Sequence, residues 1–73
     1  MDTGDTWEYC TMEWVWQYAT IRLNTTDGTE KKFGGAYPEI VSTLNALGQD
    51  GWEVVGSVAA GNWIFWTLKR RAG

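Results

Sequence analysis

The chain has 73 residues, a formal net charge of −3, six tryptophans, one cysteine and no histidine. A single domain of this length has a core that only just offsets its chain entropy, so disulfides, metals, partners or dense packing must help. A single cysteine excludes an internal disulfide, and the lack of histidine nearly excludes a zinc site. The three basic residues near the end of this acidic chain make a poor binding patch for nucleic acid.

Residues 7–23 form a stretch without glycine or proline, rich in aromatic and β-branched residues, which is typical of a β-strand. One straight strand of these 17 residues would span about 56 Å, whereas its expected partner, the seven residues 52–58, spans about 23 Å. About half of the stretch therefore lacks a partner inside a compact domain. A bulge near residues 11–13 lacks the usual glycine or asparagine, so we favour pairing with a second copy of the chain.

Turn residues follow this stretch at Asp27-Gly28 and at Gly34-Gly35. A small hairpin over residues 20–33 is an alternative to one long strand, although the charges of its second arm make it marginal.

The segment 38–47 shows the clearest helix signal. Pro38 and Glu39 suit the first turn of a helix, and Gly48 suits the left-handed residue after its end. One apolar stripe follows helical spacing and consists of Ile40, Val41, Leu44 and Leu47. We expect this stripe to pack against a sheet.

Two β-rich runs, 52–58 and 63–68, flank a short linker with Gly61 and Asn62 and predict an antiparallel hairpin. Strand alternation predicts the side chains that face the helix, which are Trp52, Val54, Val58, Ile64, Trp66 and Leu68. Gly56 indicates a bulge or a close approach of the helix. Residues 63–68 are apolar on both faces of the strand, so we place strand 63–70 between 52–58 and the first strand.

Together these elements predict an α+β fold, a β-α-β-β unit with a three-stranded antiparallel sheet, strand 63–70 in the centre and helix 38–47 on one face. Residues 1–13 would form an acidic and aromatic N-terminal β extension, and residues 14–71 a single domain. The sheet face without a helix would expose a contiguous aromatic patch, which usually marks an interface. The candidate interface residues are Trp7, Tyr9, Trp14, Trp16, Tyr18, Val55, Trp63 and Phe65.

Three segments, "WQYATIRL", "LNALGQDGWEVVGS" and "FWTLKRR", resemble a bacterial and phage family of small domains of unknown function. Its motifs are W-E-Y, L-N-x-L-G-x-x-G-W-E-x-V and L-K-R, and the resemblance covers Trp16 to Arg70. It implies a β-α-β-β unit whose first strand begins at Trp16. It implies no activity, cofactor or catalytic residue.

The charge distribution bears on location and on the two ends of the chain. The acidic start lacks the basic region of a signal peptide, and the longest uncharged run, residues 54–68, is shorter than the roughly 18–20 apolar residues of a membrane span. We therefore expect a cytoplasmic protein without a membrane segment. The acidic start and the basic end at residues 69–71 should attract each other.

The residue types favour binding over catalysis. Without histidine, a serine or cysteine nucleophile lacks its usual base, and Cys10 lies among apolar residues, so we expect no enzyme, no metal and no cofactor. We favour a non-enzymatic protein-interaction module that forms a homo-oligomer, most simply a dimer, through its aromatic sheet face or its N-terminal strand, or that binds an unidentified protein. Two alternatives stay open: an aromatic platform for a carbohydrate-like ligand, and a small phage-type inhibitor of a host protein.

Overall fold

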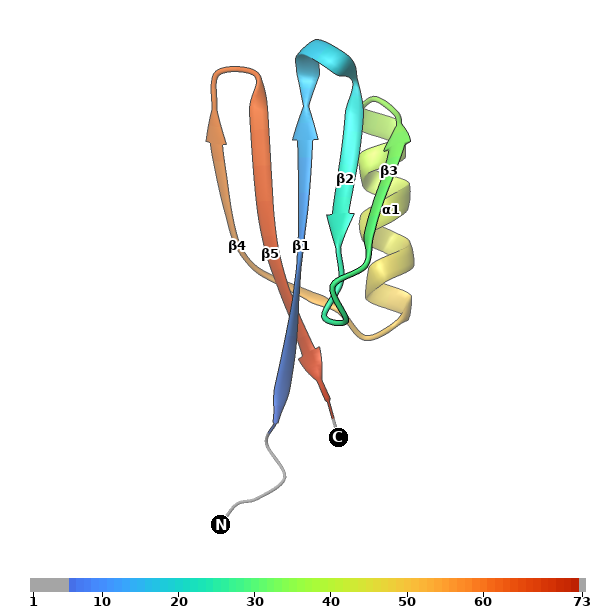
Figure 1. Cartoon of the computed structure of the whole chain (residues 1–73), viewed down its shortest axis with the longest axis vertical. Helices are drawn as coiled ribbons and strands as arrows, with labels where there is room; N and C mark the ends of the chain where they lie inside the picture. Colours follow the sequence, from blue (N-terminus) through green and yellow to red (C-terminus); the bar gives the residue numbers. More distant parts are fainter. Residues whose placement is uncertain (1–5, 73) are drawn as a thin grey trace.

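The computed structural model describes residues 6–72 and shows one antiparallel sheet with one α-helix on one face (Figure 1). The elements are β1 (Trp7–Val15), the 3₁₀ helix η1 (Trp16–Tyr18), β2 (Thr20–Asn24), β3 (Glu30–Gly34), α1 (Tyr37–Gln49), β4 (Glu53–Ala60) and β5 (Trp63–Arg71). The strand order is β3-β2-β1-β5-β4. The predicted α+β class is confirmed, but the sheet has five strands rather than three.

The two unpredicted strands arise because the stretch 7–23 folds back on itself. η1 reverses the chain, and Ala19 adopts the left-handed conformation with φ 46° and ψ 49°, which costs a residue with a Cβ about 1–2 kcal/mol. The backbone N–H of Trp16 donates to the carbonyl of Asn62 at 2.8 Å and so ties this turn to the β4–β5 turn. β2 then pairs with β1 and with β3, so the hairpin over residues 20–33 does form.

β1 occupies the centre of the sheet. β5 lies between β4 and β1 as predicted, yet β2 and β3 extend the sheet on the other side of β1. β1 pairs with β5 over its whole length, from Trp7 opposite Arg71 to Val15 opposite Trp63, so the expectation of an unpaired half-strand is wrong. A boundary after residue 13 would cut through β1, and the first five residues of the predicted extension lie outside the described part of the chain.

The core lies between α1 and one face of the sheet. Alternate residues of β1 point into it, and helical spacing brings Ile40, Leu44 and Leu47 onto it, whereas Val41 is 57% exposed and does not belong to the buried stripe. The buried core residues are Cys10, Met12, Trp14, Ile21, Leu23, Ile40, Leu47 and Leu68. Of the residues predicted to face the helix, Trp52, Ile64 and Trp66 pack against this cluster.

Both ends of α1 are fixed by local hydrogen bonds. At its start the carboxylate of Glu39 accepts a hydrogen bond from the N–H of Ala36 at 2.7 Å, and Pro38 lies in the first turn. At its end the N–H of Trp52 donates to the carbonyl of Leu47 at 3.0 Å, while Gly51 has a φ of +91°. The helix thus runs past Gly48, and Gly51 rather than Gly48 is the left-handed residue of a Schellman motif.

A β-bulge in β4 changes which side chains face the helix. The pairing with β5 jumps from Val54 opposite Leu68 to Gly56 opposite Thr67, so Val55 is the extra residue. Beyond the bulge Val58 lies opposite Phe65, on the sheet face away from α1 and not on the helix side as predicted. No side chain or backbone atom lies within 4 Å of a Cβ placed on Gly56, so Gly56 is not a close approach to the helix.

Candidate interaction surface

The sheet face opposite α1, called the open face below, divides into a polar part and an apolar part. The β-sheet register assigns Glu13, Arg22 and Glu30 to the polar part over β1, β2 and β3. The apolar part lies over β5 and β4 and includes Trp63, Phe65 and Val58. The rings of Trp63 and Phe65 lie 5.7 Å apart between centroids.

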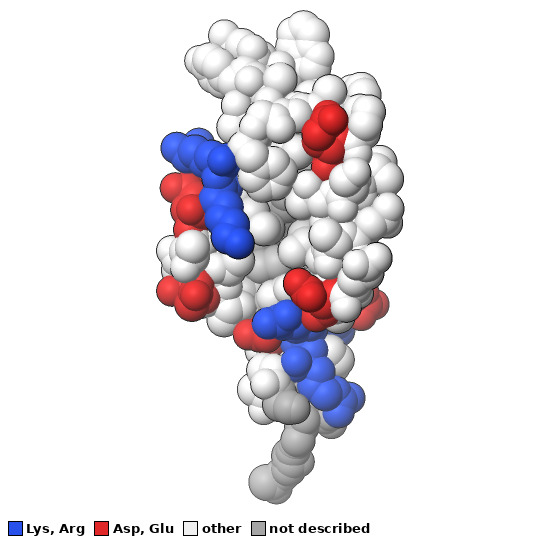
Figure 2. Space-filling view, turned by 90° about the vertical axis from the view of Figure 1, so that its right-hand side faces the viewer, with Lys and Arg blue, Asp and Glu red and all other residues white. Residues whose placement is uncertain are grey.

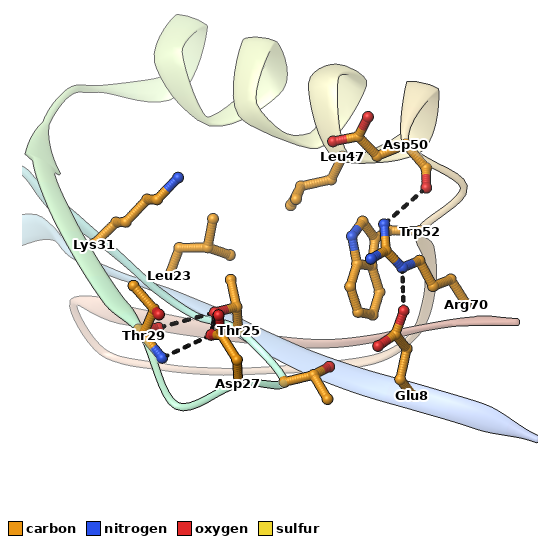
Figure 3. A pocket seen from close by; sticks show the side chains of 11 residues that line it. Glu8, Leu23, Thr25, Asp27, Thr29, Lys31, Leu47, Asp50, Trp52 and Arg70 are labelled. Carbon is orange, nitrogen blue, oxygen red and sulfur yellow. Dashed lines mark hydrogen bonds and ion pairs between the residues drawn. The ribbon is translucent and has the colours of Figure 1, made fainter. Parts of the chain in front are cut away.

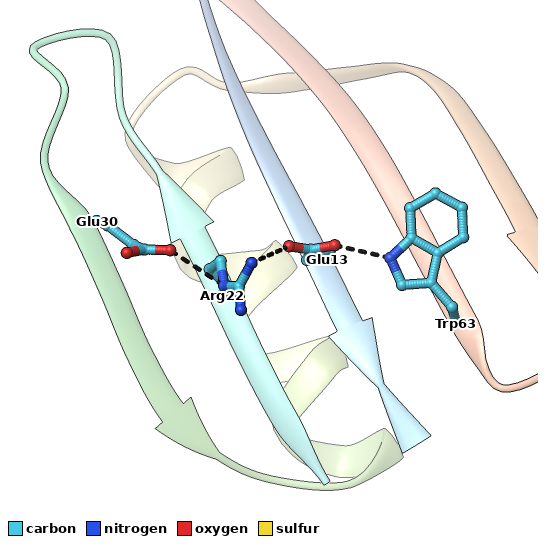
Figure 4. A network of polar contacts seen from close by, with 4 residues as sticks. All are labelled: Glu13, Arg22, Glu30 and Trp63. Atoms are coloured by element: carbon cyan, nitrogen blue, oxygen red, sulfur yellow. Dashed lines mark hydrogen bonds and ion pairs between the residues drawn. The ribbon is translucent and has the colours of Figure 1, made fainter. Parts of the chain in front are cut away.

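A polar network extends from the polar part to Trp63 in the apolar part and so crosses four strands (Figure 4). The carboxylate of Glu13 accepts a hydrogen bond from Trp63 Nε1 at 2.7 Å and another from Arg22 Nη1 at 2.9 Å. Arg22 Nε lies 3.0 Å from Glu30 Oε2 in an ion pair without hydrogen-bond geometry. This network holds the edge of the Trp63 indole toward β1, and the side chain is half-buried.

β4 forms one edge of the sheet and has little of the protection that edge strands usually have. All eight of its residues are exposed, including Val54, Val55 and Val58 at 44%, 47% and 58%. Residues 54–62 carry no charge. In Figure 1, α1 lies behind β2 and β3, at the end of the sheet remote from β4. In the described part of the chain, α1 therefore does not cover this edge, and the strand has no charge after Glu53.

β3 forms the opposite edge and is strongly charged. Its five residues are all exposed and include Glu30, Lys31 and Lys32. Figure 2 shows basic side chains gathered over this side of the molecule, with acidic side chains beside them. A short, charged strand of this kind discourages the addition of another strand. The two edges of the sheet therefore differ in chemistry.

The basic end of the chain is occupied by contacts within the molecule. Arg70 forms an ion pair with Glu8, which confirms that the two ends attract each other, and its guanidinium lies 4.4 Å from the ring centroid of Trp52. The ring of Trp7 has Lys69 Nζ at 4.2 Å and the Arg71 guanidinium at 5.6 Å. These cation–π contacts partly shield Trp7, which is 39% exposed.

A mixed polar hollow of about 490 Å³ lies between the β2–β3 turn and the C-terminal end of α1 (Figure 3). Lys31 and Arg70 are its basic residues; Arg70 forms an ion pair with Glu8 and donates to the carbonyl of Asp50 at 3.1 Å. The pKa of Asp27 is lowered to about 2 because the Thr25 hydroxyl and the Thr29 backbone N–H donate hydrogen bonds to its carboxylate. These contacts stabilise the turn and form no pair of nucleophile and base.

An aromatic hollow of about 430 Å³ lies where η1, the β4–β5 turn and the start of α1 meet. Trp16 and Tyr37 are each 63% exposed beside it, and the ring of Tyr37 lies 5.1 Å from that of Trp14 between centroids. All of its lining residues are uncharged: Trp14, Trp16, Tyr37, Ala59, Gly61, Asn62, Trp63 and Ile64. Its chemistry suits a neutral, ring-shaped group.

The predicted interface residues do not form one patch. Trp14 is 3% exposed and belongs to the core, so its assignment to the open face is wrong. Side chains alternate between the two faces along β1, and Trp14 lies on the same face as Cys10 and Met12, which is the face toward α1. Its Nε1 donates to the carbonyl of Gly35 at 3.1 Å. The residue therefore anchors the β3–α1 connection.

The other predicted residues divide between three places. Trp16 and Tyr18 lie in the turn η1, 63% and 71% exposed, rather than in the first strand as the family resemblance implies. Trp7, Tyr9, Trp63 and Phe65 share the open face by register, and Val55 occupies the β4 bulge. Sequence reasoning missed Val58 and Glu13, because the bulge reverses the alternation and an isolated acidic residue gives no sign of its partners.

Two further findings concern chemistry. Cys10 is buried, and this burial raises the pKa of its thiol although the nearby Arg70 charge acts in the opposite direction. Within residues 6–72, no cluster of carboxylate and thiol groups is suitable for a metal ion, and no helix is long and apolar enough to cross a membrane.

Comparison with known proteins gave no match to a family model, to a curated protein or to a solved structure. The resemblance of the chain to small W-E-Y domains therefore stays a prediction.

Proposed function

We propose that this chain is a non-enzymatic protein-interaction module that self-associates as a dimer through the uncharged side of its sheet, where β4 lies. The exposure of all eight residues of β4 is the observation that supports this function most strongly. A long, uncharged edge strand is a template for another strand, and exposed apolar surface beside it is typical of an interface.

The internal pairing of β1 argues against exchange of the N-terminal strand, the second mode of association considered above. β1 pairs with β5 along its whole length and with β2 from Thr11 to Val15. Exchange would break both sets of backbone hydrogen bonds and re-form the same bonds in the other copy, so it would add no contact that a single chain lacks. We therefore assign self-association to the preformed surface.

Light scattering and sedimentation of the purified chain at micromolar concentration test this function. We expect a dimer whose mass falls toward that of the 8.3 kDa chain on dilution. Val58→Lys should shift the dissociation constant upward by at least about tenfold, because a charge at an apolar contact costs about 1.4 kcal/mol or more. Val41→Lys is the matched control, since Val41 and Val58 are 57% and 58% exposed and Val41 lies on α1. A wild-type monomer at all concentrations would refute the proposed function.

The aromatic hollow favours a second candidate, a platform for a carbohydrate-like ligand. Exposed Trp16 and Tyr37 could stack on a sugar ring, and the side chain of Asn62 could bind a hydroxyl group. Tryptophan fluorescence titrated with short neutral oligosaccharides tests this: saturable quenching that Trp16→Ala abolishes supports it, and unchanged fluorescence contradicts it. A cytoplasmic location and the lack of a nucleic-acid partner stay predictions from composition.

A further inference from the structure

We infer that two copies of this chain join edge to edge, with β4 of one copy antiparallel to β4 of the other, so that the two five-stranded sheets become one continuous sheet. This inference rests on the proposed function and specifies its geometry. It replaces a face-to-face stack of the two open faces, which the same apolar residues would also permit.

The difference between the two sheet edges selects β4. Natural proteins protect edges with short strands, charged residues, prolines, bulges or covering elements. β3 has five residues and three charges, whereas β4 has eight residues, no proline and no charge after Glu53. Its only protective feature is the bulge at Val55, and the pairing with β5 is regular from Gly56 to Ala60. This regular segment is the part of the edge that can accept a strand.

The sequence of β4 suits a second copy rather than a charged peptide. Antiparallel pairing of two identical strands places a two-fold axis perpendicular to the sheet, so each residue must lie opposite a residue on the same face. The uncharged run 54–62 is centred at Val58, and pairing about this centre places Gly56 opposite Ala60 and Ser57 opposite Ala59 of the other copy. No like charges then face each other. A β3 edge paired in the same way would bring lysines of the two copies together.

The position of α1 permits this arrangement. The two-fold axis puts both helices on the same side of the joined sheet. Because α1 lies behind β2 and β3, at the far end from β4, the helices stay at the two outer flanks (Figure 1). Trp63 and Phe65 then remain on the opposite side, outside the contact between the copies.

Cysteine cross-linking distinguishes edge pairing from face stacking. Ser57 and Ala59 lie opposite Trp66 and Ile64, which pack against the core, so both point to the helix side of the sheet. In the variant Ser57→Cys/Ala59→Cys, cysteines of two copies would meet whether the axis passes residue 57, 58 or 59, within the Cβ separation a disulfide requires. In a face-to-face stack these cysteines would point away from the partner. The matched control is Ser42→Cys/Ala46→Cys, which introduces the same two changes at exposed positions of α1.

We expect most of the Ser57→Cys/Ala59→Cys protein to become a disulfide-linked dimer under mild oxidation at micromolar concentration. The control variant should remain unlinked, and so should the wild type, whose one cysteine, Cys10, is buried. Trp63→Lys should keep the dimer, since Trp63 lies outside an edge contact. In the wild type, those amide protons of residues 56–60 that point away from β5 should exchange more slowly as the protein concentration rises, a readout that needs no variant. Loss of the dimer in Trp63→Lys, together with absent cross-links, would overturn edge pairing while self-association stands. A monomeric wild type would overturn both.

Discussion

Gly35 connects β3 to α1 at a point where no side chain fits, and its replacement by alanine is the most direct test of how the helix is placed. A Cβ on Gly35 would lie 2.5 Å from Glu39 Cβ and 2.9 Å from Glu39 Cγ. The Cβ of Glu39 is fixed to the helix backbone, so the first turn of α1 would have to move. The N–H of Gly35 donates to the carbonyl of Ala19 at 2.8 Å, and its carbonyl accepts from the Trp14 indole.

The cost of Gly35→Ala follows from these contacts. Overpacking costs about 1–3 kcal/mol, and weakening one of the two hydrogen bonds adds about 1 kcal/mol. We therefore expect the free energy of unfolding to fall by about 2–4 kcal/mol, which would lower the melting temperature of so small a domain by at least about 8 °C.

Urea unfolding followed by tryptophan fluorescence, at one fixed protein concentration, measures this loss. Gly34→Ala is the control, because a Cβ on Gly34 would meet only the Ala19 carbonyl oxygen at an ordinary 3.8 Å. This control should stay within about 0.5 kcal/mol of the wild type. If the two alanine variants unfold at the same urea concentration, the close approach of Gly35 to α1 does not exist.

Four further predictions concern stability and reactivity. Glu13→Ala should lower the free energy of unfolding in urea by about 1.5–3 kcal/mol, because it removes the acceptor of both Trp63 Nε1 and Arg22 Nη1. Glu30→Ala should cost less than about 0.5 kcal/mol, because its ion pair with Arg22 is about two-fifths exposed, and equal losses would contradict the network. Gly48→Ala should raise the free energy of unfolding by about 0.5–1 kcal/mol, since Gly48 lies inside α1 with open space around it. Gly51→Ala should lower the free energy of unfolding, because Gly51 has a φ of +91°. If Gly48→Ala destabilised the protein and Gly51→Ala stabilised it, the helix would end at Gly48. The pKa of Asp27 is lowered from 3.8 to about 2, so the stability that its ionised form provides is present above about pH 4 and is lost as the pH falls toward 2. Asp27→Asn should remove this pH dependence of stability. An NMR titration midpoint of the Asp27 carboxyl near 3.8 would refute the prediction. The Cys10 thiol, whose pKa is raised by burial, should react with a thiol reagent at neutral pH only as fast as the chain opens, and prompt labelling of the folded protein would contradict this.

Strong local signals allowed the helix and the hairpin that follows it to be predicted from the sequence. Pro38 and Glu39 at the start of α1, its apolar spacing, and Gly61 at a turn each act within a few residues, and the structure contains the helix and the β4–β5 hairpin at these places. The side chains on β5 that face the helix were also assigned correctly, because that strand has no bulge.

The fold-back at η1 could not be predicted from local signals. The turn contains no glycine, asparagine or proline, and Ala19 adopts a left-handed conformation that alanine disfavours. Long-range bonds stabilise it, from Trp16 to Asn62 and from Gly35 to Ala19. Because neither bond is visible in the sequence, the stretch 7–23 was expected to be one strand with an unpaired half.

The same limit applies to the candidate surface. Trp63 and Phe65 were placed on the open face by simple alternation, whereas the bulge at Val55 moved Val58 to that face. The fold-back also invalidated the reasoning that put Trp14 beside Trp16. Parity arguments therefore hold within one regular strand and fail across a bulge or an unrecognised turn.

The charges on β3 have a consequence for how large an assembly can become. A sheet that accepts strands at both edges polymerises without limit and yields fibres, as in cross-β aggregates. In the dimer proposed above, the charged edge β3 with Lys31 and Lys32 would not accept a strand, so only the β4 edges would pair and assembly would stop at two chains. Under this proposal, replacing both lysines with valine should let the β3 edges pair as well, so that the dimers would join into filaments.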